Sequence, residues 1–67
     1  MFRNKKWMIK CKVDIEIGTE TTIITKARTS YKAKLKAIDE CYNKGYFYAE
    51  VLSCQEITEE DYNNLSV

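Results

Sequence analysis

The sequence has no histidine, and this absence limits the chemistry available to it. Histidine titrates closest to neutral pH and is the commonest general base and the commonest metal ligand. The 67 residues also contain no proline and only two glycines, which lie at expected turns and form no phosphate-binding motif. Three widely spaced thiols, at Cys11, Cys41 and Cys54, match neither a disulfide framework nor a CxxC metal motif. We expect reduced thiols, no metal and no cofactor.

Catalytic constellations are also missing. A cysteine nucleophile needs a neighbouring base or an electropositive, partly exposed setting, whereas Cys11 and Cys41 fall on expected core faces. Neighbouring acids occur at Asp14 with Glu16, at Asp39 with Glu40 and at 59–61, but none lies in an expected cleft, so they are interpreted as solvated. The sequence therefore predicts a protein that is not an enzyme and has no catalytic residues.

No long hydrophobic run is present. The basic start of the chain is followed by only three apolar residues, at 7–9, before Lys10, which is too short for a signal peptide or a membrane span. We therefore expect a cytoplasmic protein that is neither secreted nor embedded in a membrane. At this length, residues 1–67 make one domain with one small core, with residues 1–5 flexible.

Residues 7–17 alternate strictly between apolar and mostly charged side chains, which is typical of a half-buried β-strand. A break at 18–20 and a second run at 21–28, rich in β-branched residues, predict a β-hairpin with a bulged turn. On the second strand we expect Ile23, Thr25 and Ala27 to face inward, and Thr22, Ile24, Lys26 and Arg28 to face outward.

A helix is expected over 31–43, after an N-cap at Thr29 or Ser30 and before Gly45 at its C-terminal end. Its apolar residues recur at helical spacing, at Tyr31, Leu35, Ile38, Cys41 and Tyr42, with Ala37 beside them. Lys34 falls inside this stripe, so it either extends past the edge of the sheet or marks where the helix approaches a partner.

Residues 46–54 predict a third strand whose facing is open, because two registers fit. One register buries Phe47, Ala49 and Val51 and exposes Tyr46, Tyr48 and Glu50. The other buries Tyr48, Leu52 and Cys54. The first is preferred because an unpaired Glu50 is costly to bury.

Residues 58–61 resemble a capping box, so 58–67 are expected to form a short acidic C-terminal helix or tail. The order is then ββαβ plus this helix, which is an α+β fold. Chain connectivity predicts a three-stranded antiparallel sheet in the order 2-1-3. The main helix is expected to cover one face of the sheet, with Leu35, Ile38 and Cys41 against Ile9, Cys11, Val13 and Ile15.

Charges are sorted along the chain although the net charge is only +1. Basic residues without acids occupy 1–12 and 26–36, and acids without basic residues follow Lys44. Lysine, isoleucine, tyrosine and asparagine are plentiful, a bias that follows from an AT-rich genome. In size and composition the chain resembles the accessory proteins of bacteriophages and mobile elements of low-GC bacteria. That resemblance implies a bacterial host cytoplasm and an inhibitor or modulator of a host protein, such as a defence nuclease.

Binding is therefore the expected function, and the sequence offers two kinds of partner. A protein partner is preferred, because tyrosine, methionine and tryptophan are enriched in interfaces and an exposed sheet face or edge can be covered by another chain. The alternative is single-stranded nucleic acid, held by cations and stacking aromatics. The expected contact residues on the open sheet face are Lys10, Lys12, Ile24, Lys26, Arg28, Tyr46 and Tyr48. Those at the acidic end are Glu56, Glu59, Glu60 and Asp61. A homodimer is compatible with either partner.

Overall fold

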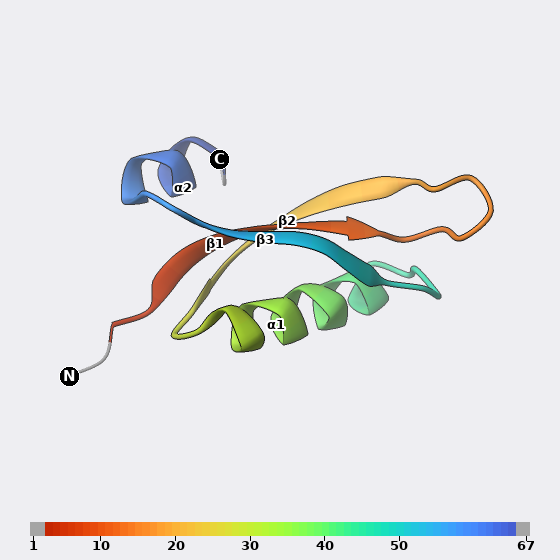
Figure 1. The fold of residues 1–67 in the computed structure, drawn as a ribbon, viewed down its shortest axis with the longest axis horizontal. Helices are drawn as coiled ribbons and strands as arrows, with labels where there is room; N and C mark the ends of the chain where they lie inside the picture. The colour runs from red at the N-terminus through yellow and green to blue at the C-terminus, as the bar shows by residue number, and fades with distance from the viewer. Residues whose placement is uncertain (1–2, 66–67) are drawn as a thin grey trace.

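The fold is known from a computed structural model that describes residues 3–65. Five elements follow one another: β1 (Lys5–Lys12), β2 (Glu20–Ala27), α1 (Ser30–Asn43), β3 (Glu50–Ile57) and α2 (Glu59–Leu65). The strands form one antiparallel sheet in the order β2-β1-β3, which confirms the predicted α+β topology. Figure 1 shows α1 on one face of the sheet and α2 on the other. The sequence predicts residues 1–5 to be flexible, but Lys5 already belongs to β1, where it pairs with Ala27. Residues 1 and 2 lie outside the described residues.

Strand β1 is shorter than the alternating pattern predicts. The Asp14 Oδ1 atom accepts hydrogen bonds from the backbone amides of Glu16, at 2.8 Å, and Ile17, at 3.2 Å. This side-chain turn competes with the sheet and ends the strand at Lys12, and Gly18, with a φ of 80°, returns the chain to β2. Val13 is buried as predicted, but the prediction that Ile15 enters the core is wrong, because the turn holds it in solvent.

The central strand supplies most of the large core side chains. Trp7 and Ile9 are buried, and the Trp7 Nε1 atom donates a 2.9 Å hydrogen bond to the carbonyl of Ala27. On β2, Ile23 and Ala27 are buried as predicted and Thr25 is half-buried. This core is small, so the free energy of unfolding is expected to lie near the low end for globular domains.

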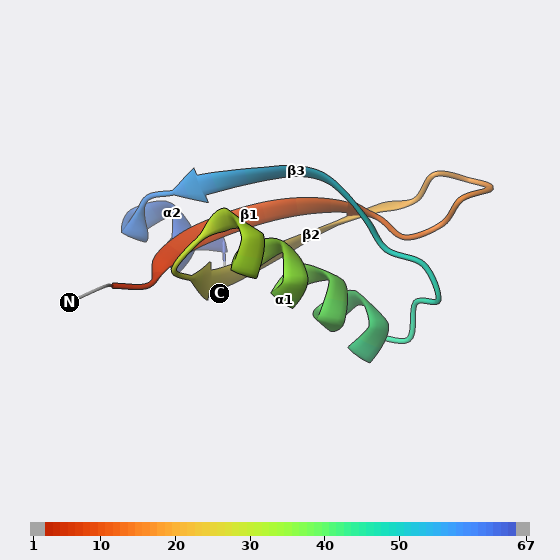
Figure 2. The ribbon, with the colours of Figure 1, turned by 60° about the horizontal axis from the view of Figure 1, so that its bottom comes forward.

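Helix α1 packs on the sheet through a different face from the one that its large apolar residues predict. It begins after Thr29, whose Oγ1 accepts from the Lys32 amide at 3.2 Å. Its buried residues are small and spaced four apart, at Ala33, Ala37 and Cys41. The prediction that Leu35 faces the sheet is wrong, because it is exposed, and Ile38 is only half-buried. Tyr31, at the start of the same apolar stripe, is exposed as well. Small side chains let the helix lie close to a sheet whose own large residues fill the space between them. Figure 2 shows α1 running along this face.

Strand β3 begins at Glu50 rather than at Tyr46, and a β-bulge combines the two predicted registers. Cys11 pairs with Val51 while Lys10 pairs with Ser53, so Leu52 is an extra residue. As a result Ala49 and Val51, from the preferred register, and Cys54, from the other, pack against the core. The prediction that Phe47 is buried is wrong, since it is 98% exposed in the connection before β3.

Helix α2 lies against the sheet face that was expected to be open. The Thr58 Oγ1 atom accepts from the Asp61 amide at 3.0 Å and caps the helix, as the sequence predicts. Lys26 lies over the ring of Tyr62, with Nζ 5.2 Å from the centroid. Lys6 reaches Glu59, with Nζ 3.9 Å from Oε1. Lysines of this sheet face and residues of the acidic C-terminal helix are therefore in contact with each other.

Gly45 is expected to be sensitive to substitution because α1 ends on it in a left-handed conformation. Its φ is +101°, its amide donates to the Tyr42 carbonyl at 3.0 Å, and the Tyr46 amide donates to the Cys41 carbonyl at 3.2 Å. Gly45→Ala should lower the free energy of unfolding by about 1 kcal/mol or more, and Gly45→Asn should cost less. Because an added Cβ meets nothing within 4 Å, the cost is conformational. Urea denaturation measures it, and equal stability of all three proteins would contradict the assignment.

Candidate functional site

The core thiols are in an environment that suppresses their reactivity. Burial, with smaller effects from the neighbouring Cys41 and Cys54 thiols, raises the pKa of Cys11 to about 11. Burial also raises the pKa of Cys54, against a lowering effect of Lys34. Both thiols are therefore protonated at neutral pH, and a protonated thiol is a poor nucleophile and a poor metal ligand.

Within residues 3–65, no group of three or more cysteine and carboxylate side chains is arranged to hold a metal ion. In the same range, no helix is both long and apolar enough to cross a membrane.

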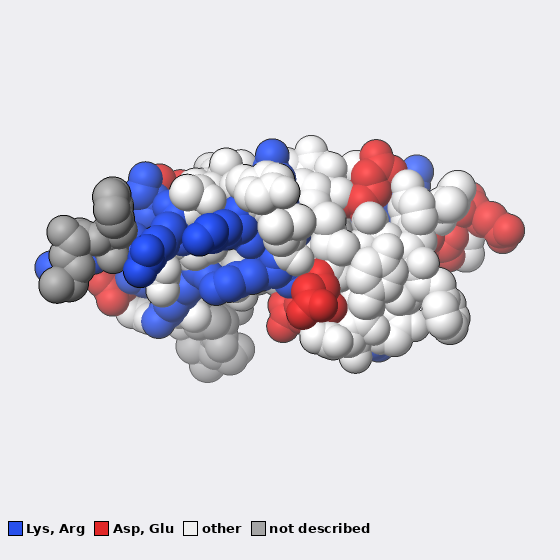
Figure 3. Space-filling model, turned by 90° about the horizontal axis from the view of Figure 1, so that it is seen from below, with Lys and Arg blue, Asp and Glu red and all other residues white. Residues whose placement is uncertain are grey.

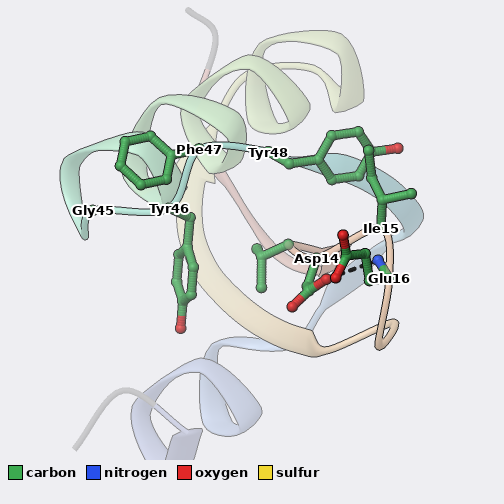
Figure 4. Close-up of a pocket in the computed structure, with 8 residues that line it drawn as sticks. Asp14, Ile15, Glu16, Gly45, Tyr46, Phe47 and Tyr48 are labelled. Atoms are coloured by element: carbon green, nitrogen blue, oxygen red, sulfur yellow. Dashed lines mark hydrogen bonds between the residues drawn. The ribbon is translucent and has the colours of Figure 1, made fainter.

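The most distinctive surface is a shallow open depression of about 410 Å³ at the end of the molecule away from α2. The loop between β1 and β2 forms one wall and the connection between α1 and β3 forms the other. The lining residues are mostly apolar or aromatic, with two acids: Val13, Asp14, Ile15, Glu16, Gly45, Tyr46, Phe47 and Tyr48. Figure 4 shows Tyr46 and Tyr48 projecting to opposite sides of the depression. We call these lining residues, together with Ile17, the apolar end.

Hydrogen bonds hold both walls of the apolar end in place. In the first wall, the Val13 amide donates to the Thr19 carbonyl at 2.8 Å and the Gly18 amide donates to the Asp14 carbonyl at 3.0 Å, in addition to the Asp14 side-chain turn. In the second wall, the C-terminal hydrogen bonds of α1 fix Gly45 and Tyr46. Large apolar side chains are thus displayed on ordered loops, with Ile17 82% exposed.

Tyr48, which lines the depression, is hydrogen-bonded to Glu50, the first residue of β3. Its hydroxyl donates a 2.7 Å hydrogen bond to the Glu50 Oε1 atom. This hydrogen bond, together with lesser effects of desolvation and of the Glu50 charge, raises the pKa of Tyr48 above its ordinary value. The phenol therefore stays neutral, and its ring direction is fixed by the acceptor that begins the strand.

Part of the expected basic and aromatic surface is assembled as predicted. Lys10, Lys12, Ile24 and Lys26 share the sheet face turned away from α1, because β1 and β2 pair Met8 with Ile24 and Lys6 with Lys26. Lys10 lies beside Glu20, with Nζ 3.9 Å from Oε1. Arg28 follows the end of β2 and is exposed.

The aromatic part of that surface lies elsewhere. Tyr46 and Tyr48 precede β3 and belong to the apolar end, so they do not flank the lysines of the sheet. The cations of α1 form a separate group at the exposed residues Lys32, Lys34 and Lys36, and the Lys36 Nζ donates to the Lys26 carbonyl at 2.7 Å. Seen from the α1 side in Figure 3, lysine and arginine gather over one half of the molecule.

The acidic end is divided between two environments. Glu56 lies 4.0 Å from the Lys5 Nζ and Glu59 lies 3.9 Å from the Lys6 Nζ. Glu60 and Asp61 are exposed on the first turn of α2. Exposed ion pairs at these distances contribute little stability, so the acids remain accessible to a cationic partner.

Sequence reasoning missed part of the exposed apolar surface because it assigned Ile15, Leu35 and Phe47 to the core. Ile15 and Phe47 belong to the apolar end, and Tyr31, Leu35 and Tyr42 lie on the outward face of α1. One signal was present: small residues at 33, 37 and 41 form a second continuous helical face, and a helix packed closely on a sheet can use such a face.

Comparison of the chain with protein-family models, with curated proteins and with solved structures finds no match.

Proposed function

We propose that the chain is a non-enzymatic protein-binding module and that its apolar end is the binding site. The supporting observation is the exposure of Ile15 and Phe47, which line the depression from its two walls, with Ile17 exposed on the same loop as Ile15. Contiguous exposed apolar surface of this kind marks interaction sites, because water contact with it is unfavourable and a partner removes that contact. Aromatic anchors in such a surface carry most of the binding energy.

The charge of the apolar end indicates the chemistry of its partner. Asp14 and Glu16 line the depression, and no lysine or arginine is among its lining residues. An acidic rim repels phosphate and attracts a cationic side chain. The matching partner is a protein that presents an apolar side chain beside a lysine or arginine.

An inhibitory role toward a host protein such as a defence nuclease is the finer form of this proposal. It derives from the composition of the chain and from the acids of α2. Glu60 and Asp61 are the acids best placed to enter a basic groove, since Glu56 and Glu59 already lie near lysines.

Single-stranded nucleic acid is the second candidate ligand. The observation in its favour is the alignment of Lys10, Lys12 and Lys26 on one sheet face. It is the weaker candidate because the tyrosines lie elsewhere and α2 brings Glu59 to that face.

Photo-crosslinking from position 47 tests the proposed site. A benzoylphenylalanine placed at Phe47, with the protein in a bacterial lysate, should yield a discrete protein adduct that is lost in an Ile17→Asp background. The same probe at Gln55, which is exposed on the opposite part of the sheet, is the matched control and should not give this adduct. Identical adducts from both positions, or an adduct unaffected by Ile17→Asp, would show that the apolar end is not the binding site.

A salt titration with a generic single-stranded oligonucleotide separates the two ligand classes. If the chain is a protein-binding module, we expect it not to bind the oligonucleotide even at low salt. Binding that weakens by roughly 0.7 log units per log unit of salt for each phosphate contacted would favour nucleic acid instead. In that case Lys10→Glu combined with Lys26→Glu should abolish it, and Glu59→Lys should not.

A further inference from the structure

The outward face of α1 carries a seam of large apolar residues that nothing in the described chain covers. Tyr31 is 69% exposed, Leu35 49% and Tyr42 50%, and Ile38 is half-buried between them. They follow one another at spacings of four, three and four residues, which is the a/d pattern of a helix that packs against a second helix. We call these four residues the α1 seam. The sheet is contacted by a different face, through Ala33, Ala37 and Cys41.

Charges beside the seam identify what kind of helix fits it. Lys32 and Asp39 are seven residues apart, so they occupy the same position relative to the seam, on one flank of it. The N-terminal half of the helix is basic, with three lysines from 32 to 36, and the acids Asp39 and Glu40 follow. In Figure 3 acidic side chains adjoin the basic half of this face.

A second copy of the same helix matches this arrangement when it runs antiparallel. In an antiparallel helix pair, residues on equivalent flanks face each other, so Lys32 meets the partner's Asp39 and Asp39 meets the partner's Lys32. The seam then places Tyr31 against the partner's Tyr42 and Leu35 against the partner's Ile38. A parallel pair would instead bring one basic half against the other, and like charges at such positions are destabilising.

The shape and core of the domain are consistent with a need for a partner. Its accessible surface is 5030 Å², whereas a compact monomer of 7.9 kDa is expected to have about 4,400 Å². Among residues 3–65, the nine buried residues include three alanines and two cysteines, so little apolar area is removed from water within one chain. A dimer that covers the α1 seam of both chains would remove more apolar area from water.

We propose that α1 mediates an antiparallel two-fold homodimer, with the α1 seam at its centre and two symmetric Lys32–Asp39 pairs at its flank. This inference rests on a different surface from the apolar end, and neither depends on the other. None of the four α1 seam residues is among the residues that line the depression, so one dimer would present two binding sites.

Sedimentation or light scattering as a function of concentration tests the dimer. The wild-type chain should be dimeric, and Leu35→Asp, which places a charge in the seam, should raise the dissociation constant by at least roughly 30-fold. Circular dichroism checks that the variant is folded, as expected for an exposed position. Phe47→Asp is the matched control, and it should remain dimeric. A monomeric wild type, or a dimer that survives Leu35→Asp, would overturn the proposal.

Charge reversal tests the antiparallel arrangement. Lys32→Asp and Asp39→Lys should each weaken the homodimer roughly fivefold to tenfold, because each creates two repulsive pairs. Mixing the two variants should give a heterodimer in which both pairs are attractive. Lys34→Asp is the control, since Lys34 faces Asp39 only in a parallel pair and should have little effect. If Lys34→Asp weakens the dimer and Lys32→Asp does not, the antiparallel arrangement is wrong.

Discussion

Ala37→Leu is expected to destabilise the domain strongly although it adds a good helix-forming, apolar residue. Ala37 is fully buried where α1 meets the sheet, and a longer side chain there must push the helix away from Ile9 and Ile23. Overpacking of this kind costs about 1–3 kcal/mol and occasionally more. In a domain with so small a core, this is a large part of the free energy of unfolding. Urea denaturation followed by circular dichroism measures the loss.

Two further substitutions on α1 are controls that show whether the effect of Ala37→Leu comes from its buried position. Glu40→Leu introduces the same side chain at an exposed position and should change the free energy of unfolding by less than about 0.5 kcal/mol. Leu35→Ala, measured at the lowest practical protein concentration so that association contributes little, should also cost little. If Leu35→Ala instead costs about 2–5 kcal/mol, as for a core leucine, the helix packs through the α1 seam and the described orientation is wrong.

Ile9→Ala is expected to have an effect of similar or greater size. Ile9 is fully buried on the central strand, where it pairs with Ile23 on one side and Cys54 on the other. Removing its side chain loses transfer free energy and leaves a cavity bounded by three elements, which together cost about 2–5 kcal/mol. We expect the variant to be partly or wholly unfolded at room temperature, with the loss visible in the denaturation midpoint.

Ile17→Ala is the matched control for Ile9→Ala, because it deletes the same atoms from a side chain that is held in solvent. Its free energy of unfolding should stay within about 0.5 kcal/mol of the wild type. A similar loss for both substitutions would mean that the loop between β1 and β2 packs into the core, and the apolar end would then not exist as a surface.

The sequence predicted much of the architecture because the relevant signals are local. Alternation through 7–13, the Thr29 cap, Gly45 and the Thr58 cap each depend on residues within a few positions of one another, and all of them hold in the structure. Connectivity then limits a ββαβ chain to few sheet orders, and the order β2-β1-β3 follows.

The candidate site was predicted less well, because its residues are brought together by tertiary structure. Alternation alone assigned Ile15 to the strand, whereas the Asp14 turn removes it. Periodicity alone could not resolve β3, since a bulge at Leu52 lets Val51 and Cys54 face the same side. The lysines of the sheet were correctly grouped, but their tyrosine neighbours belong to another surface.

By itself, the sequence determined the order of elements, the absence of histidine chemistry and the separation of basic from acidic segments. Only the tertiary structure decided which face of α1 is buried, because a helix with large residues on one side and small ones on another can pack through either. The space beneath it is already filled by Trp7, Ile9 and Ile23, so the small face fits and the large face is left outside. That choice is what exposes the α1 seam.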